Sequence, residues 1–342
     1  MNEIIQNLER EFNVQILKSI LPLKGENTYN TDESGRITSL YLRKIELSNI
    51  DRFLDTSSSL TELSLEFCEI RNIKSIKSFN QVKKLILSYN PLLSSEIEQI
   101  KYLKELNHLE LNSVELKNTK FLQDLVNLEL LSLCGSDHLY EIKELENLDK
   151  LRNLNLSFNR IDSFSKLSLN KNIESINLRS GKLTSLVGVE KYPNLIELNL
   201  SGNSISKIEN LENLKNLKYL NLSSMRLSKI EGLDKLYELE VLDISDQLIK
   251  LIEGLGNLKK LKQLNLSENN ISRVENLDNL QNFEYVLLEH NDIVEFDSKF
   301  LNYLNSSCFI SLVGNPIKEI KGYVPDNVKI QFEEPNWVPK SL

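Results

Sequence analysis

The sequence predicts an α/β solenoid, in which short parallel strands stack side by side and compact turns join them. Three observations indicate this fold. A motif of the form LxxLxLxxNxIxxI recurs along most of the 342 residues, it returns at a nearly constant interval, and each copy changes from a strand-like to a turn-like spacing of apolar residues. Hydrophobic residues make up 40% of the chain, which is enough for one long continuous core.

The fourth motif position is an aliphatic residue that marks each repeat. Clear copies of the motif are LIELNLSGNSISKI at residues 195–208 and LKQLNLSENNISRV at residues 261–274. The markers are Leu40, Leu63, Leu85, Leu109, Leu131, Leu154, Ile176, Leu198, Leu220, Leu242, Leu264, Val286 and Ile310. Successive markers lie 22 to 24 residues apart, with six consecutive steps of 22. This regularity predicts thirteen repeats, each with one strand.

The spacing within a repeat predicts which residues form the core. The LxL triplet has the period of two that a short strand requires, with its leucines on one side and the intervening residues on the other. Apolar residues then follow at a spacing of about three, as at Ile205, Ile208 and Leu211, which is typical of 3₁₀ or irregular turns. Since no repeat can bury its leucines alone, we expect a horseshoe with a concave parallel sheet of about 13 strands, a 3₁₀ or irregular convex side, and caps at both ends.

Two longer steps between markers leave room for a helical turn on the convex side. They contain residues 88–106 (SYNPLLSSEIEQIKYLKEL) and residues 295–308 (EFDSKFLNYLNSSC).

The ninth motif position is often asparagine. An amide side chain supplies both a donor and an acceptor where the chain leaves the strand, so we interpret these residues as structural. They are Asn90, Asn159, Asn203, Asn269, Asn291 and Asn315. Other residues interrupt the row, and we expect those repeats to be locally looser. The interruptions are Cys68, Val114, Ser136, Gly181, Met225 and Gln247.

The N-terminal residues 1–36 precede the repeats and predict a helical cap. Ile4, Leu8, Phe12, Ile16 and Ile20 recur at helical spacing, so an amphipathic helix would cover the exposed core of the first repeat. The alternative is a helix that binds a partner.

The repeat array extends over residues 37–320, and residues 321–342 form a C-terminal cap and tail. Val328, Ile330 and Phe332 alternate with polar residues, which predicts a last strand. Trp337 lies in the proline-containing tail, where we expect it to anchor packing in preference to contacting a partner.

Charge and cysteine content exclude several classes of partner. The chain has 41 basic and 49 acidic residues, and a net charge of −8 disfavours nucleic acids and anionic membranes. The N-terminus, MNEIIQNLEREF, carries acids where a signal peptide is basic. Cys68, Cys134 and Cys308 lie in different repeats without a CxxC pair, so we expect free thiols. These features predict a cytoplasmic protein, which we expect to be monomeric.

The 22-residue period and the consensus pattern LxNLxxLxxLxLSxNxIxxIExL resemble those of the short leucine-rich-repeat class. That class includes the repeat-built regulatory subunit of type-one serine/threonine phosphatase, the bacterial internalins and the repeat domains of Roco proteins. The resemblance covers roughly residues 37–320. It implies the horseshoe fold and a concave face that grips another protein. The tail after Ile320 departs from the cap of the phosphatase subunit, and the chain contains no GxxxxGK[ST] loop of a Roco GTPase domain.

The solvent-facing residues of each strand occupy motif positions three, five and seven, with position eight at the rim. The middle repeats carry asparagine and serine there, whereas both ends carry the aromatic and apolar residues typical of interface hot spots. The N-terminal candidates for partner binding are Tyr41, Arg43, Glu66, Phe67, Ile86 and Tyr89. The C-terminal candidates are Tyr219, Val241, Asp243, Tyr285, Leu287, Glu289, His290 and Phe309. For Tyr41 and Phe309, packing under the caps is an equal alternative.

Acidic residues outnumber basic ones in these four rows. The acids are Glu62, Glu66, Glu110, Glu197, Asp243, Asp246, Glu268 and Glu289. The bases are Arg43, Lys44, Lys84 and Arg179. This excess favours a protein partner with a basic patch.

Motifs for catalysis are absent from the sequence. The three histidines, His108, His138 and His290, are far apart in the repeat order, and there is no HExxH, GxSxG, phosphate loop or glycine-rich dinucleotide turn. We therefore expect no catalytic residue, no cofactor and no metal. The favoured function is a protein-interaction scaffold or adaptor. The alternatives are a regulatory subunit of an enzyme such as a serine/threonine phosphatase, and an exported effector or adhesin.

Overall fold

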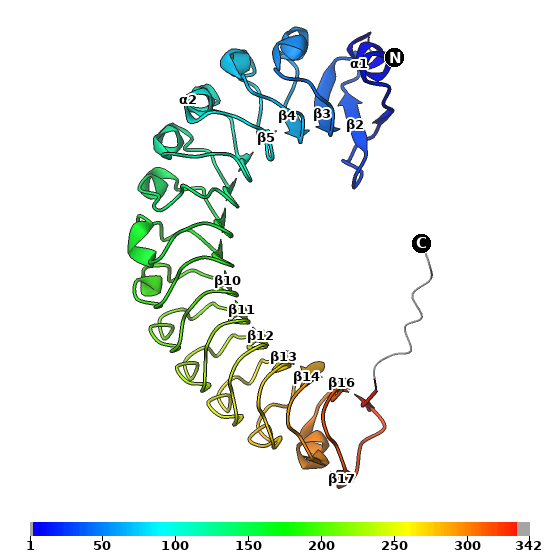
Figure 1. Cartoon of the computed structure of the whole chain (residues 1–342), viewed down its shortest axis with the longest axis vertical. Coiled ribbons are helices and arrows are strands. Elements are labelled where there is room, and N and C mark those ends of the chain that lie inside the picture. The colour runs from blue at the N-terminus through cyan, green and yellow to red at the C-terminus, as the bar shows by residue number, and fades with distance from the viewer. Residues whose placement is uncertain (1–2, 334–342) are drawn as a thin grey trace. The chain divides into compact units, whose positions relative to one another are not determined.

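All thirteen marker residues lie in short β-strands of the computed structural model, which describes residues 3–333 (Figure 1). The markers are buried, and the residues on either side of them are mostly exposed or half-buried. This alternation is the period of two that the LxL triplets predict. The predicted repeat solenoid with a mainly parallel sheet is therefore confirmed.

The chain forms two compact units. The N-terminal unit comprises Met1–Ile161 and Lys166–Ile173, and the C-terminal unit comprises Asp162–Ser165 and Glu174–Leu342. Each unit is a stack of repeats with its own buried core.

In the N-terminal unit, strands that follow one another along the chain are neighbours in the sheet. The strands are β1 (Ile16–Lys18), β2 (Asn27–Thr31), β3 (Ile37–Arg43), β4 (Glu62–Glu66), β5 (Lys84–Ile86), β6 (His108–Glu110), β7 (Leu130–Ser132) and β8 (Asn153–Asn155). From β3 to β8 the pairs are parallel, with Leu63, Leu85 and Leu109 directly opposite one another. β2 and β3 form an antiparallel pair.

The C-terminal unit repeats this arrangement. Its sheet strands are β9 (Ser175–Asn177), β10 (Glu197–Asn199), β11 (Tyr219–Asn221), β12 (Val241–Asp243), β13 (Gln263–Asn265), β14 (Tyr285–Leu287), β16 (Cys308–Ser311) and β18 (Val328–Gln331). All of these neighbours are parallel, and the markers stay in register from Ile176 through Ile310 to Ile330. A separate two-stranded parallel sheet pairs β15 (Glu295–Asp297) with β17 (Glu319–Lys321).

The side of each unit opposite the strands consists of short helices and turns (Figure 1). The helices are α2 (Ser94–Ile97), η1 (Asp51–Thr56), η2 (Lys74–Ser78), η3 (Glu98–Tyr102), η4 (Lys120–Asp124), η5 (Leu145–Asn147), η6 (Phe164–Lys166), η7 (Val189–Lys191) and η8 (Ser298–Tyr303), all 3₁₀ except α2. The two longer steps contain α2 with η3, and η8, so their predicted helical turns are confirmed. Within residues 3–333, none of the helices has the length and hydropathy needed to cross a bilayer.

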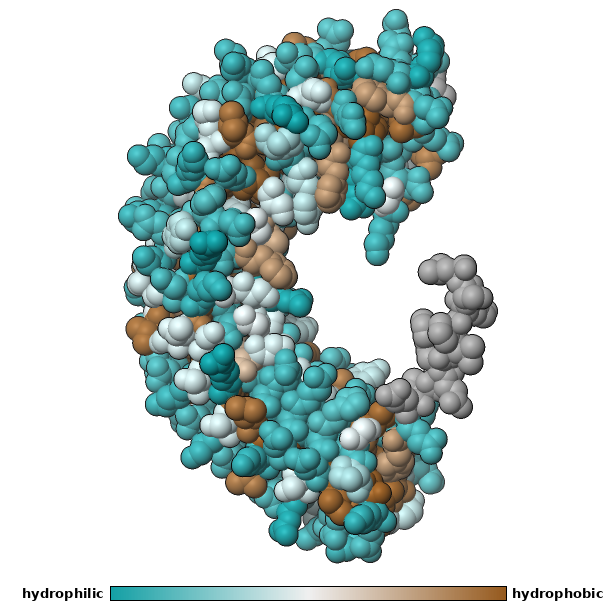
Figure 2. Space-filling model, viewed as in Figure 1, coloured by the Kyte–Doolittle hydropathy of each residue, from teal (hydrophilic) through white to brown (hydrophobic). Residues whose placement is uncertain are grey.

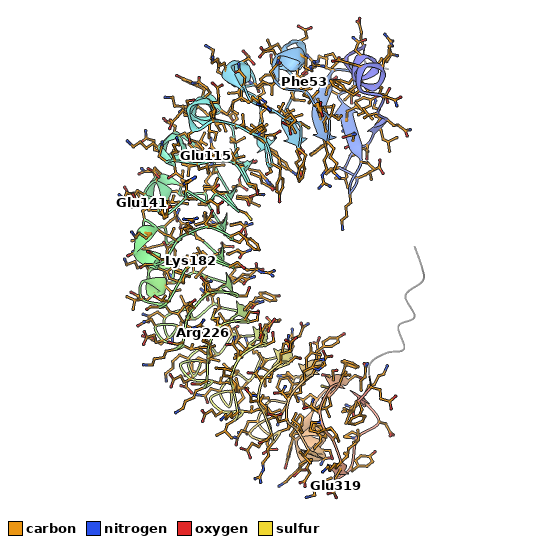
Figure 3. All side chains as sticks on the ribbon, in the orientation of Figure 1. Phe53, Glu115, Glu141, Lys182, Arg226 and Glu319 are labelled. Atoms are coloured by element: carbon orange, nitrogen blue, oxygen red, sulfur yellow. The ribbon has the colours of Figure 1, made fainter. Side chains whose placement is uncertain are left out.

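The core consists of leucine and isoleucine ladders with aromatic residues between them and the helical side. Phe53, labelled in Figure 3, is fully buried, as are Phe79 and Phe121 in the N-terminal unit and Tyr192 and Phe283 in the C-terminal unit. Each repeat thus covers the apolar side chains of the next, which removes them from water.

The six predicted asparagines do have a structural role. In Asn269, Nδ2 donates to the carbonyls of Ile244 and Leu266, each at 3.0 Å, and Oδ1 accepts from the backbone N–H of Ile249 at 3.0 Å. The other five make corresponding bonds across the repeat boundary. The asparagine row therefore satisfies backbone groups that would otherwise be buried without partners.

Some of the interrupting residues replace part of this bonding. Gln247 donates to the carbonyl of Leu222 at 2.6 Å and accepts from the N–H of Leu227 at 2.9 Å. The Ser136 hydroxyl donates to the carbonyl of Val114 at 2.7 Å. The looseness of these repeats stays a prediction.

The N-terminal helix is shorter than its apolar spacing predicts. α1 (Glu3–Phe12) buries Ile5 and Leu8, and Glu11 pairs with Arg52 of η1 at 2.9 Å. Ile16 lies in β1, and Ile20 is 85% exposed, so the expectation that both continue the helix is wrong. The reason is strand pairing, because β1 gains a parallel partner in β2.

The predicted C-terminal strand is confirmed. Val328 and Ile330 lie in β18, and Phe332 follows it with 38% of its surface exposed. Figure 2 shows hydrophobic side chains gathered over β16 and β17 at this end of the C-terminal unit. Trp337 lies outside the described residues.

Replacing Asn269 by alanine is expected to lower the free energy of unfolding by about 2 to 3 kcal/mol, because buried backbone groups lose their partners. Urea denaturation followed by circular dichroism measures this. Asn265→Ala is the matched control, since Asn265 lies in the same repeat but on the exposed side of the sheet, and its expected cost is below about 1 kcal/mol. Equal losses for the two variants would contradict the structural role.

Candidate protein-binding surface

One face of each strand is not covered by the helical side. Side chains at motif positions three, five and seven emerge from this face, which we call the open face. On it, Tyr219 and Tyr285 are 42% and 48% exposed, although both lie beside fully buried markers. Large aromatic groups are thus held at fixed positions in solvent.

Five predicted contact residues form a cluster in the C-terminal unit, which we call the β11–β16 patch. Its members are Tyr219, Val241, Tyr285, Leu287 and Phe309. Tyr219 lies opposite Val241 in the register, and Tyr285 lies opposite Phe309 with ring centroids 6.3 Å apart. Phe309 is half-buried because its other neighbour is Lys329 of β18.

Two grooves open on either side of β12. One, of about 420 Å³, extends from β9 to β12 and includes Tyr219 in its lining. The other, of about 440 Å³, extends from β12 to β14 and includes Tyr285 and Leu287. Val241 and Asp243 line both grooves, so the patch offers two adjacent hollows separated by one strand.

The polar residues around the patch are fixed by local hydrogen bonds. The Oδ1 atoms of Asn199, Asn221 and Asp243 each accept from the backbone N–H and the hydroxyl of a serine two residues further on. These side chains therefore lose little rotational freedom when a partner covers them. The predicted polar row therefore places side chains of fixed conformation next to the aromatic residues of the patch.

Glu289 and His290 lie at the margin of the patch. Glu289 accepts from the hydroxyl of Ser311 at 2.6 Å. The His290 ring lies so close to Gly314 that a Cβ there would be 2.3 Å from Nδ1. Glu289 is half-buried and His290 is exposed, and Glu289 adds negative charge at the margin of the patch.

In the N-terminal unit, the predicted residues form a chain of contacts. Phe67 and Tyr89 stack with centroids 4.2 Å apart and an interplanar angle of 5°. The Arg43 guanidinium lies 5.2 Å from the Phe67 centroid, and its Nε is 3.9 Å from Glu66. Tyr41 is half-buried and donates to Glu62.

Ile86 differs from the other predicted contacts, because only 8% of its surface is exposed. Neighbouring side chains cover most of it. Ile86 therefore forms part of the floor of a groove and offers little surface to a partner. That groove, of about 370 Å³, is also lined by Tyr41, Arg43 and Leu23.

Position eight has a conformation that the sequence analysis did not predict. In every repeat this residue has a positive φ, between 50° and 74°. The row is Lys44, Phe67, Tyr89, Ser113, Gly135, Phe158, Ser180, Gly202, Ser224, Asp246, Glu268, His290 and Gly314. For residues other than glycine, left-handed backbone costs about 1 to 2 kcal/mol, and bulky aromatic residues such as Phe67 and Tyr89 are uncommon there.

The loop between β1 and β2 is a second feature that the helical spacing does not predict. Ile20, Leu21 and Leu23 are 85%, 71% and 46% exposed. The sequence predicts a helical cap over residues 1–36, although Pro22 and Gly25 are signals for a turn.

His108 and Glu110 form a coupled pair of titratable groups on the open face. Nε2 of His108 lies 2.6 Å from Oε1 of Glu110, and this hydrogen bond lowers the pKa of Glu110 against the opposing effect of burial. Asn112 and Ser132 continue the hydrogen-bonded chain, with no activated nucleophile in it. Across residues 3–333, no group of three or more potential metal ligands occurs.

Comparison with known proteins agrees with the repeat architecture. The family model described as leucine-rich repeats in two copies matches residues 193–235, which include β10 and β11. No curated protein sequence matches the chain.

Solved structures extend the match over most of the chain. A leucine-rich-repeat protein from Leptospira interrogans is 27% identical, covers 80% of this chain and 77% of its own, and has a TM-score of 0.68. An internalin from Listeria monocytogenes is 19% identical, covers 84% of this chain and 87% of its own, and has a TM-score of 0.68. Mouse RP105, in a complex with MD-1, is 25% identical over 82% of this chain and 50% of its own, with a TM-score of 0.64.

The chain is a leucine-rich-repeat protein. The structural register and the family match identify the same repeats. Proteins of this family are known for protein–protein interaction and are generally not catalysts. The open face of the leucine-rich repeats is therefore the surface on which to look for binding.

The three cysteines of this leucine-rich-repeat protein are free thiols, as predicted. Burial raises the pKa of Cys68 to about 11 and that of Cys308 to about 12. Cys134 is half-exposed in the N-terminal unit. Because the thiolate is the reactive form, the first two are chemically protected.

Iodoacetamide at pH 8 is expected to modify Cys134 at least tenfold faster than Cys68 or Cys308, because at that pH only about one Cys68 thiol in a thousand is ionised. Peptide mass spectrometry over a time course measures the three rates. In urea all three should react alike. Fast labelling of Cys68 in the folded chain would contradict its position in the core.

Proposed function

We propose that this leucine-rich-repeat protein is a non-catalytic scaffold or adaptor that binds a partner protein through the open face, with the β11–β16 patch as the main contact. The observation that carries the proposal is the exposure of Tyr219 and Tyr285 on a rigid sheet face. Aromatic residues with fixed backbones bury much area at little entropic cost, which is why they dominate interface energies.

The charge around the patch favours a partner with a basic surface. Asp243 lines both grooves, Glu289 lies beside Leu287, and Asp246 and Glu268 occupy position eight nearby. Acidic groups at the margin of an apolar patch mainly accelerate and orient the association with a basic partner. The complex is therefore expected to form more slowly as salt is added.

The structural comparison supports a protein as the partner. RP105 shares the repeat fold over 82% of this chain and is seen in a complex with another protein, MD-1. For this chain we propose that one monomer binds one such partner in the cytoplasm, where its three free thiols would stay reduced.

The triple variant Tyr219→Ala, Tyr285→Ala and Leu287→Ala is expected to weaken partner binding at least a hundredfold, because it removes the two aromatic anchors and the apolar residue beside one of them. Affinity purification with mass spectrometry identifies the partner, and isothermal titration with the purified partner gives the affinity.

The matched control is Tyr237→Ala, Leu248→Ala and Leu251→Ala. These residues belong to the same unit and are 47%, 57% and 53% exposed, but they lie outside the β11–β16 patch. The control is expected to bind like the wild type. Equal affinities for the two triple variants would remove the patch as the contact surface.

A further inference from the structure

A second cluster of exposed apolar and cationic groups occupies the N-terminal unit. It consists of the β1–β2 loop (residues 19–26) and four residues at the end of the neighbouring strands, which are Arg43, Lys44, Phe67 and Tyr89. We call this the loop–rim site. One groove connects the two parts, because its lining includes both Leu23 of the loop and Arg43.

The loop holds its apolar residues in solvent by hydrogen bonds. The Ser19 N–H donates to the carbonyl of Tyr29 at 2.9 Å, the Ser19 hydroxyl donates to the carbonyl of Leu21 at 2.6 Å, and the Glu26 N–H donates to the carbonyl of Leu23 at 3.1 Å. Ile20 and Leu21 are nevertheless 85% and 71% exposed. A fixed loop that presents aliphatic side chains to water is typical of an interaction site.

The backbone conformation of Phe67 and Tyr89 at the rim also suggests an interaction site. Phe67 has a φ of 53° and Tyr89 a φ of 60°, at a motif position that is glycine or serine in most other repeats. Glycine there would remove the strain, whereas the aromatic pair adds stacking mostly on the surface, where Phe67 and Tyr89 remain 36% and 42% exposed. Ten non-glycine residues at position eight share this strained backbone, so the exposed stacked pair, and not the strain alone, indicates a binding site here.

The charges at this site indicate what it binds. Lys24 and Lys84 line the groove without an ion-pair partner among the described residues, and Lys44 extends the rim. The lining also contains Arg43, whose Nε lies 3.9 Å from Glu66, and Glu26. Glu62 lies opposite Lys84 in the strand register, so four cations face three carboxylates at the site. The site thus carries a local positive excess in a chain of net charge −8.

We propose that the loop–rim site binds a segment of another protein in which carboxylate side chains alternate with aliphatic ones. The aliphatic groups would contact Ile20, Leu21 and the Phe67 ring, and the carboxylates would reach the lysines and Arg43. This goes beyond the proposed function, because it assigns a second site with the opposite charge preference. A membrane is disfavoured as the occupant, since the acidic chain as a whole is repelled by anionic lipid.

Selection of a phage-displayed random dodecapeptide library on the full chain tests the proposal. The bound phage are eluted after a negative selection on the double variant Phe67→Gly and Tyr89→Gly. Peptides that combine aspartate or glutamate with leucine, isoleucine or valine are expected to be enriched. Failure to enrich any peptide, or enrichment of basic or uncharged ones, would overturn the proposal.

The dissociation constant of the best synthetic peptide is then measured by fluorescence anisotropy. Phe67→Gly with Tyr89→Gly is expected to weaken binding at least tenfold, while its urea midpoint stays equal or rises because strain is relieved. Phe158→Gly is the matched control, since Phe158 is also an exposed aromatic residue at position eight, with a φ of 57°. It is expected to leave binding unchanged.

Two more variants separate this site from the other possibilities. Ile20→Ser with Leu21→Ser changes only exposed loop side chains, so it tests the site even if the glycine variant unfolds, and it too should weaken binding tenfold. The β11–β16 triple alanine variant should bind the peptide normally, which separates this proposal from the proposed function. Binding of the wild type, but not the loop variant, to phosphatidylcholine vesicles with 30% phosphatidylserine, in place of peptide, would overturn it in favour of lipid.

Discussion

The structure depends on one constraint, which is that a 22-residue repeat cannot bury its own leucines. The side chains of one repeat become a core only when the next repeat covers them, and parallel strands in register achieve this with Leu198, Leu220 and Leu242 directly opposite one another. The same constraint leaves the other side of each strand without a covering layer. The open face is therefore a consequence of the repeat, and its side chains can be changed without changing the core.

Stacking also buries backbone N–H and carbonyl groups at the point where each strand ends. Two features of the repeat give these groups hydrogen-bond partners. The asparagine at position nine bonds backbone groups of its own repeat and of the preceding one, as Asn269 does with Leu266 and Ile244. The left-handed residue at position eight turns its N–H toward the next repeat, as Phe67 does toward the carbonyl of Ser88. Because backbone bonds make this turn, position eight tolerates many side chains, and aromatic residues can occupy it when binding favours them.

The sequence predicted the parts of the molecule that obey the period. The thirteen strands, the asparagine bonds, the 3₁₀ side and the two longer helical turns all follow from spacing, which physical burial enforces at every repeat. The parts outside the period were not predictable in this way. Ile16 and Ile20 have helical spacing from α1, but pairing between β1 and β2 overrides that local preference. The left-handed conformation at position eight is difficult to predict from Phe67 and Tyr89, because aromatic residues do not favour it. Gly135, Gly202 and Gly314 in the same row do indicate it. Which exposed side chains meet a partner depends on that partner, so periodicity can place the candidates but cannot rank them.

The most direct test of the account is carbene footprinting of the chain alone and in complex with the partner that it captures. If the open face is the docking surface, labelling of peptides that contain β11, β12 and β14 should fall strongly in the complex, while labelling of the helical side around η7 should stay constant. Protection confined to the helical side, with the strands labelled equally in both states, would show that the open face is not where this leucine-rich-repeat protein binds.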